Sequence, residues 1–157
     1  MDECVDLART AMRLGEVPIA SVVARGGEVI GWGWNEFRAK RDLTMHAEIA
    51  AMRDAAGRYP LDEPDLILVT TLEPCVMCTG AAYLCGVSTI VYALPAPADG
   101  GMGRVAPPSS PEANRPAVVG PMRQDEIRGM FKQWMARHGD AGPQGKFVAQ
   151  LLALTEA

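Results

Sequence analysis

Long apolar runs are missing from this sequence of 157 residues. No stretch approaches the roughly 20 consecutive apolar residues that a helix needs to cross a bilayer. The first residues, MDECVDLARTAMRLGE, are charged and have no apolar core of the kind found in signal peptides. We therefore expect a cytoplasmic protein without a membrane partner.

An excess of positive charge is also missing, since the formal net charge at pH 7 is −4. This balance gives no general attraction for phosphate backbones, although acids elsewhere can mask a local basic patch. RNA or single-stranded nucleic acid therefore stays open as a partner. Hydrophobic residues (48%) and charged residues (22%) are close to the averages of soluble globular domains, which excludes the disordered and fibrous classes.

The chain has no internal repeat and no domain-sized linker, and its length suits one ordinary domain. We therefore expect a single domain over residues 1–157. Residues 95–116 are rich in Pro, Gly, Ser and Ala without a sustained period, which predicts an irregular surface loop. Residues 121–157 are expected to form a C-terminal helical part.

Hydrophobic periodicity predicts helices and strands that alternate along the chain. The predicted helices cover residues 3–14, 46–57, 74–85, 124–138 and 146–157, and the predicted strands cover 18–24, 28–35, 66–72, 87–94 and 117–120. This alternation predicts an α/β fold in which helices cover a sheet.

The predicted strand over residues 28–35 has two unlike faces. Gly31 and Gly33 share one face, which would let a helix pack closely, and Trp32 and Trp34 share the other. The two tryptophans are suited to stacking on a base, but alternating aromatics on one strand face more often belong to a core.

Cysteines are few, and in a chain without an export signal they serve as thiols or metal ligands more often than as disulfides. Cys75 and Cys78 stand at i and i+3, so they share one face of a predicted helix. Cys85 follows about two helical turns later, too far along the helix axis to reach the same ion. We interpret Cys4, Cys85 and His138 as structural residues.

Two predicted helix starts bring together the residues with metal and proton chemistry. His46 and Glu48 open one helix, and Cys75 and Cys78 open the next. Helix starts can gather at one end of an α/β sheet, and the unpaired amides at a helix N-terminus lower the pKa of a thiol. The spacing therefore permits one metal site made by His46, Cys75 and Cys78.

Three ligands of the types His, Cys and Cys leave one tetrahedral position of zinc open, which is typical of a catalytic site. Water bound there has its pKa lowered toward about 7, and Glu48 could carry its proton to a leaving group. We therefore expect one Zn²⁺ per chain. The alternatives are a redox pair or half of a four-ligand zinc site; the first does not require His46 or Glu48, and the second lacks a fourth ligand at suitable spacing.

The sequences HAE at 46–48 and PCVMC at 74–78 match the signature of zinc deaminases. Together with EVPIA at 16–20 and GWN at 33–35, they make residues 5–94 resemble the tRNA adenosine deaminase and guanine deaminase branch of the cytidine deaminase-like superfamily. The resemblance implies a three-layer α/β/α sandwich with a mixed sheet of about five strands, and a homodimer.

Substrate contacts are also implied by the resemblance. Asn35 takes the place of a family asparagine that touches the base or ribose, and the alternative is an asparagine that caps the strand. The other implied contacts around the metal are Pro18, Ile19, Ala20, Ala47, Glu73 and Pro74.

The C-terminal part departs from the tRNA enzymes, whose last helix is basic and aromatic. Residues 148–157 contain no Lys or Arg. Arg128 and Lys132 share one side of the helix predicted over residues 124–138, with Arg123 and Arg137 near its ends. They form either a small basic patch or, as is more common, a solvated helix face. Residues 43–45, Leu-Thr-Met, also replace the Pro-Thr-Ala usual before HAE.

Three functions follow, in this order. The first is a zinc-dependent hydrolase of cyclic amidine C–N bonds that releases ammonia from an aminated nucleobase or nucleoside, with a purine such as guanine or adenosine favoured. The second is a tRNA adenosine deaminase that makes inosine at the wobble position. The third is a noncatalytic zinc-binding interaction protein, against which Glu48 argues because such a protein needs no proton carrier.

Overall fold

The fold was analysed in a computed structural model that describes residues 1–111, 113 and 115–156. Its helices are α1 (Asp2–Arg13), α2 (Phe37–Lys40), α3 (Ala47–Ala55), α4 (Val76–Leu84), α5 (Gln124–His138) and α6 (Gly142–Thr155). Its strands are β1 (Ala20–Arg25), β2 (Glu28–Trp34), β3 (Leu66–Leu72), β4 (Val87–Leu94) and β5 (Ala117–Val119). None of the helices in the described ranges combines the length and apolar character needed to cross a membrane.

The five strands form one mixed sheet in the order β2-β1-β3-β4-β5. Strand β1 pairs antiparallel with β2 and β3, whereas β3, β4 and β5 run parallel to one another. The central position of β3 explains its nearly continuous apolar sequence, because both of its faces are covered. The mixed sheet confirms the fold class predicted from the resemblance.

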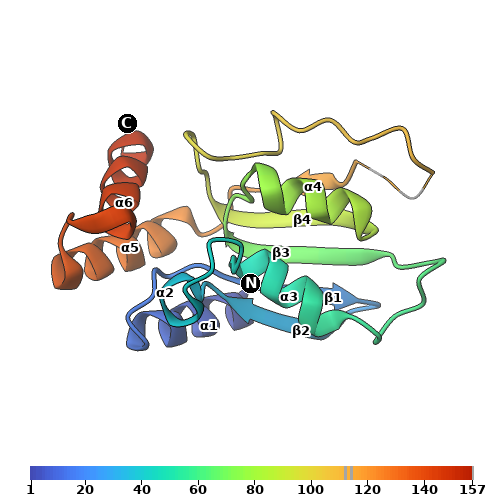
Figure 1. Cartoon of the computed structure of the whole chain (residues 1–157), viewed down its shortest axis with the longest axis horizontal. Coiled ribbons are helices and arrows are strands. Elements are labelled where there is room, and N and C mark those ends of the chain that lie inside the picture. Colours follow the sequence, from blue (N-terminus) through green and yellow to red (C-terminus); the bar gives the residue numbers. More distant parts are fainter. Residues whose placement is uncertain (112, 114, 157) are drawn as a thin grey trace.

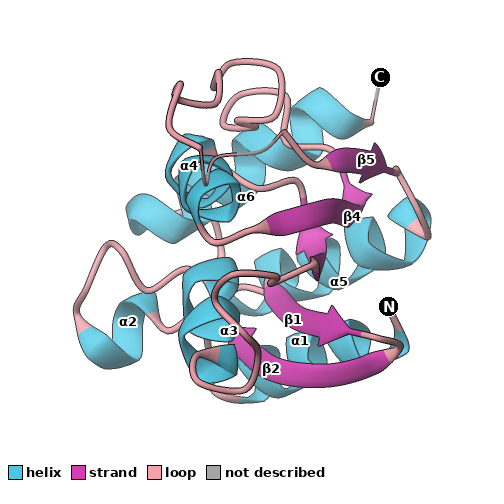
Figure 2. Ribbon diagram, turned by 90° about the vertical axis from the view of Figure 1, so that its right-hand side faces the viewer, coloured by secondary structure: helices cyan, strands magenta, loops and turns pink. Residues whose placement is uncertain are grey.

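Helices cover both faces of this sheet, with α3 and α4 on one side and α1 and α5 on the other (Figure 2). The α3 and α4 side encloses a core that includes Val23, Leu68 and Ile90. The opposite side encloses a second core that α5 and α6 share with α1. In Figure 1 the helices α5 and α6 lie beyond the left end of the sheet, close to the ends of β3 and β4. This end is where the candidate site lies.

Helix α3 packs unusually close to β2 because the facing strand positions are glycines. A Cβ atom on Gly33 would lie 2.4 Å from the Ala47 carbonyl oxygen, and one on Gly31 would lie 2.4 Å from that of Ala51. Neither contact could be relieved by a side-chain rotation, since both oxygens belong to the backbone. The close approach predicted from the glycine face is therefore present, and it fixes the start of α3.

Replacing Gly33 by Ala is expected to destabilise the fold by about 1–3 kcal/mol, the usual cost of overpacking. The control is Gly129→Ala in α5, where an added Cβ meets nothing within 4 Å and should be neutral or stabilising by roughly 0.5–1 kcal/mol. Thermal and urea unfolding of both variants measure the difference. Equal stability of Gly33→Ala and the unmodified chain would contradict the close packing of α3 on β2.

Two helix starts differ slightly from the predicted ones. The helices begin at Ala47 and Val76, and the residues before them, His46 and Cys75, are extended N-caps with ψ near 153° and 175°. Helix α6 also begins earlier than predicted, at Gly142, with Pro143 in its first turn. The short helix α2 was not predicted, since four residues are too few to show a helical period.

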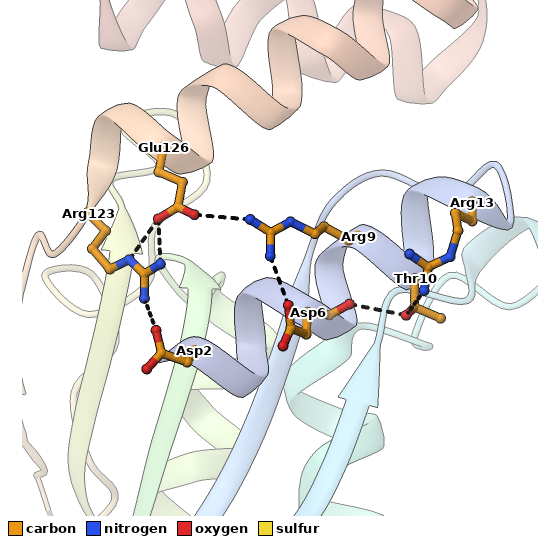
Figure 3. Close-up of polar contacts among 7 residues, drawn as sticks. All are labelled: Asp2, Asp6, Arg9, Thr10, Arg13, Arg123 and Glu126. Atoms are coloured by element: carbon orange, nitrogen blue, oxygen red, sulfur yellow. Dashed lines mark hydrogen bonds and ion pairs between the residues drawn. The ribbon is translucent and has the colours of Figure 1, made fainter.

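Ion pairs join α5 to the N-terminal helix and neutralise most of its basic residues. Figure 3 shows Arg123 between Asp2 and Glu126, and Arg9 of α1 between Asp6 and Glu126. Further along the chain, Arg128 pairs with Asp125 at 2.6 Å and Lys132 pairs with Glu156 at 2.6 Å. Three of the four residues of the predicted basic patch are thus paired with acids, which favours the interpretation of a solvated helix face.

Candidate metal centre and substrate cavity

The two helix starts bring His46, Cys75 and Cys78 together, as the sequence predicted. The His46 Nδ1 atom lies 3.5 Å from Cys75 Sγ and 3.6 Å from Cys78 Sγ. All three ligand atoms lie within 4.8 Å of one another. The extended N-caps at His46 and Cys75 turn these side chains toward each other across the ends of α3 and α4.

The spacing of these atoms suits zinc. Tetrahedral coordination with Zn–N near 2.05 Å and Zn–S near 2.3 Å places nitrogen and sulfur about 3.6 Å apart. The two nitrogen–sulfur distances agree with this value. The His/Cys/Cys group can therefore hold one metal ion while leaving a fourth position for another ligand.

Proton affinities in the cluster favour deprotonation of one thiol. The pKa of Cys75 is lowered to about 4, first by the hydrogen bond from Cys78 and also by the nearby His46. The pKa of Cys78 is raised, because it shares its proton with Cys75 and is buried. The hydrogen bond with Cys75 raises the pKa of His46. The lowered pKa of Cys75 favours its thiolate, the form that binds zinc.

Glu48 lies in the first turn of α3, two residues after His46, and the residue is only 3% exposed. Burial raises the pKa of its carboxyl to about 7. A carboxyl with a pKa near neutral can both accept and return a proton under ordinary conditions. Glu48 also lines the cavity described next, so its carboxyl can reach a bound molecule.

A cavity of about 250 Å³ opens beside the cluster. It draws its walls from both halves of the chain, and its lining residues are Val17, Ile19, Asn35, Phe37, His46, Glu48, Leu72, Glu73, Cys75, Ala96, Asp99, Pro143, Gln144 and Phe147. Most of the wall is apolar, and its polar side chains, besides the cluster residues His46 and Cys75, are Asn35, Glu48, Glu73, Asp99 and Gln144. A mostly apolar wall with a few polar groups is typical of a binding site for a small molecule.

The structure places only some of the expected substrate contacts on this cavity. Ile19, Asn35 and Glu73 are lining residues. Pro18, Ala20, Ala47 and Pro74 are not among the lining residues in the described part of the chain. Ala20 and Ala47 are completely buried, and the Pro74 carbonyl accepts hydrogen bonds from Thr79 and Gly101. These residues therefore belong to the packed structure around the cavity and not to its wall.

The lining residues that sequence reasoning missed come mainly from segments outside the motifs. Phe37 belongs to α2, Asp99 to the start of the Pro- and Gly-rich loop, and Pro143, Gln144 and Phe147 to α6. An isolated antiparallel bridge between Cys75 and Gly100 ties that loop to the metal cluster. Only the helical spacing that includes Phe147 was visible in the sequence.

The remaining candidates lie away from the cluster. Cys4 is buried and bonds to the Val69 carbonyl oxygen at 3.2 Å, and burial raises the pKa of its thiol to about 12. Cys85 is half-buried against the core under α3 and α4. Trp34 packs against the other core, while Trp32 is 39% exposed and donates a hydrogen bond to Glu3. Neither tryptophan lines the cavity.

Comparison with known proteins agrees with this geometry. The family of the cytidine and deoxycytidylate deaminase zinc-binding region matches residues 1–94. The chain belongs to this family. The match contains all three residues of the metal cluster and Glu48, and it ends with β4.

Two of the following similarities extend beyond residue 94 into the C-terminal part of the chain. A tRNA(Ile)-lysidine synthase of Deinococcus deserti is 44% identical over 132 residues, which cover 82% of this chain and 25% of that protein. A tRNA-specific adenosine deaminase of Streptococcus pyogenes is 36% identical over 95 residues, which cover 59% of this chain and 58% of that protein. A structure solved in complex with 2,6-diaminopurine has a TM-score of 0.72 at 25% identity and covers 90% of this chain and 82% of that one.

The coverage of these relatives is uneven. The chain spans about a quarter of the length of the Deinococcus relative and just over half of the Streptococcus relative. The 132-residue match is longer than the zinc-binding region, so part of the chain beyond residue 94 is shared with the Deinococcus protein.

Proposed function

We propose that the chain is a zinc-dependent hydrolytic deaminase that removes the exocyclic amine of an aminated nucleobase or nucleoside. One observation carries this proposal. The metal cluster of His46, Cys75 and Cys78 and the buried carboxyl of Glu48 border the same cavity, whose size suits one heterocycle. Membership of the deaminase family supports the same reaction.

In this proposal His46, Cys75 and Cys78 hold one zinc ion. Zinc bound there would lower the pKa of a coordinated water from about 16 toward about 7, so that a nucleophile is available at neutral pH. Glu48 would accept one proton from water and deliver it to a ring nitrogen of the substrate. It would then accept a second proton from the hydroxyl added to the ring carbon and deliver it to the departing amine, which leaves as ammonia. Burial raises the pKa of Glu48 to about 7, which makes its carboxylate a stronger base for accepting these protons.

A free purine or purine nucleoside is the proposed substrate. Phe37 and Phe147 stand on the cavity wall, where aromatic rings favour a flat heterocycle. The structurally similar protein solved with 2,6-diaminopurine supports a purine. The pairing of Arg123, Arg128 and Lys132 with acids leaves little positive charge on α5 to attract an RNA backbone.

Wobble adenosine of tRNA is the second candidate substrate. It is supported by the Streptococcus relative, whose name states tRNA-specific adenosine deamination, and by the Deinococcus relative, whose name also states a tRNA substrate. A single flipped adenine would fill the same cavity as a free base. The two candidates thus share the chemistry and differ in what reaches the cavity.

A substrate panel separates them. Zinc-loaded protein is incubated with aminated purines, pyrimidines and triazines, with their nucleosides, and with an anticodon stem-loop; ammonia release and inosine formation are measured. We expect ammonia from a free purine or its nucleoside. If inosine forms in the stem-loop and no free base or nucleoside is deaminated, the substrate is the wobble adenosine of tRNA. If folded, zinc-loaded protein shows no turnover at all, the chain is a noncatalytic zinc-binding protein.

The domain organisation belongs to the same proposal. We propose that residues 1–157 act as one domain, because buried side chains of α5 and α6, including Phe131, Trp134 and Leu151, share a core with α1 and the sheet. The irregular loop over 95–116 and the C-terminal helices over 121–157 then belong to the catalytic unit. The homodimer and the cytoplasmic location stay predictions.

A further inference from the structure

Glu16 is a buried acid that sits behind the substrate cavity. Its side chain belongs to a residue only 2% exposed, and no Lys or Arg in the described residues forms an ion pair with it. Its carboxyl is satisfied by hydrogen bonds alone. A buried carboxyl of this kind is retained only where its hydrogen bonds are well made.

Four hydrogen bonds divide between the two carboxyl oxygens. Oε1 accepts from the backbone amides of Arg38 and Ala39, both at 2.9 Å. Oε2 accepts from Asn35 Nδ2 at 3.2 Å and from Gln144 Nε2 at 3.1 Å. Glu16 thereby joins the end of β2, helix α2 and the first turns of α6, and each of these three segments contributes to the cavity wall.

The bonds to Oε2 fix the orientation of two amide side chains. An ionised carboxylate accepts hydrogen bonds and cannot donate them, so it must face the NH₂ end of each amide. The carbonyl oxygens of Asn35 and Gln144 are then the ends that Glu16 leaves free. Both residues line the cavity, as does the carboxyl-bearing Asp99.

We propose that Glu16 is a positioning residue that turns the carbonyl oxygens of Asn35 and Gln144 toward the substrate, so that the cavity selects heterocycles with N–H donors on the edge that these amides face. This inference rests on the proposed function, because it concerns specificity in the same cavity. It assigns a role to Gln144, which lies outside the matched family region. It also explains why the start of α6 is held against the zinc-binding half of the chain.

The exchange Glu16→Gln should reverse the two amides. The backbone amides of Arg38 and Ala39 both donate to Oε1, so the new side chain keeps its oxygen there and places its nitrogen at the former Oε2 position. A donor then faces Asn35 and Gln144, which must rotate to present their oxygens to it and their NH₂ groups to the cavity. The cavity would change from accepting hydrogen bonds to donating them.

The test compares the binding of 2-aminopurine and purine, which differ by one exocyclic NH₂ group. Dissociation constants are measured by calorimetry on zinc-loaded protein in a Glu48→Gln background, so that turnover does not interfere. With Glu16 present, 2-aminopurine should bind about tenfold more tightly than purine, as expected for one added hydrogen bond. With Glu16→Gln the preference should disappear or reverse.

Two further variants keep the result interpretable. Gln144→Met removes one oriented amide without touching the buried carboxyl, and it should reduce the preference at least threefold even if Glu16→Gln fails to fold. Glu63→Gln makes the same chemical change on an exposed loop residue and should leave the preference unchanged. An unchanged preference in folded, zinc-loaded Glu16→Gln and Gln144→Met, or the absence of a preference in the parent, overturns the inference. Failure of the deaminase proposal would appear separately, in the substrate panel.

Discussion

Replacing Glu48 by Gln is expected to lower turnover by about 10²- to 10⁴-fold while one zinc ion stays bound. Gln has nearly the same shape as Glu but cannot take up and return a proton near neutral pH. Glu48 is not one of the three residues that supply the clustered ligand atoms, so its exchange leaves His46, Cys75 and Cys78 in place. Steady-state kinetics on the best substrate of the panel, with zinc measured by elemental analysis, give both quantities.

The controls for this variant separate chemistry from folding. Glu28→Gln removes a carboxyl from the exposed start of β2 and should leave turnover and zinc unchanged. Glu48→Ala removes the side chain altogether and should abolish turnover, again with zinc bound. Full turnover in folded Glu48→Gln would show that another group carries the proton, and the proposed mechanism would be wrong.

The metal cluster could be predicted from the sequence because its geometry is local to two helix starts. A spacing of three residues puts Cys75 and Cys78 on one helix face, and the strand–helix alternation brings the start of α3 to the same end of the sheet. The glycines of β2 were also informative, since a residue without Cβ permits the approach that fixes α3. These arguments depend on steric and spacing rules that act over short distances.

The cavity wall could not be predicted in the same way. Gln144 lies 128 positions from Glu16 along the chain, and no periodic pattern indicates that the two side chains bond. Asp99 lies in a loop rich in Pro and Gly, where composition predicts irregularity but not direction. Four of the seven predicted substrate contacts lie behind the wall, because the motifs mark residues near the metal without showing which side chains turn toward the cavity.

The fold itself was largely predictable, with errors at its edges. The sequence pattern predicted the five strands, and the family resemblance implied that they form one mixed sheet. The starts of α3 and α4 were predicted one or two residues early, because His46 and Cys75 are extended caps. That difference has a functional consequence. An extended cap turns its side chain across the helix end, which is how two ligands from separate helices face each other.

Replacing Cys78 by Ala is expected to reduce bound zinc from one ion per chain to near none and to remove all measurable turnover. The thiol is completely buried against the cluster, and two remaining ligands cannot close a stable zinc site. The parent chain gains about 2.7 kcal/mol of stability when free zinc is about 100 times its dissociation constant, and the variant should lose this gain. Thermal unfolding with and without added zinc measures it.

Cys85→Ala provides the matched control for Cys78→Ala. Both residues belong to the α4 segment, but Cys85 caps the far end of the helix and lies outside the metal cluster. Its exchange should therefore retain zinc, turnover and the zinc-dependent rise in unfolding temperature.

A chelator that strips zinc from the parent chain should reproduce the loss of turnover seen in Cys78→Ala, and added zinc should restore activity only to the parent. Zinc-independent turnover in the stripped parent chain would contradict the role of the metal, because the proposed nucleophile depends on zinc to lower the pKa of water.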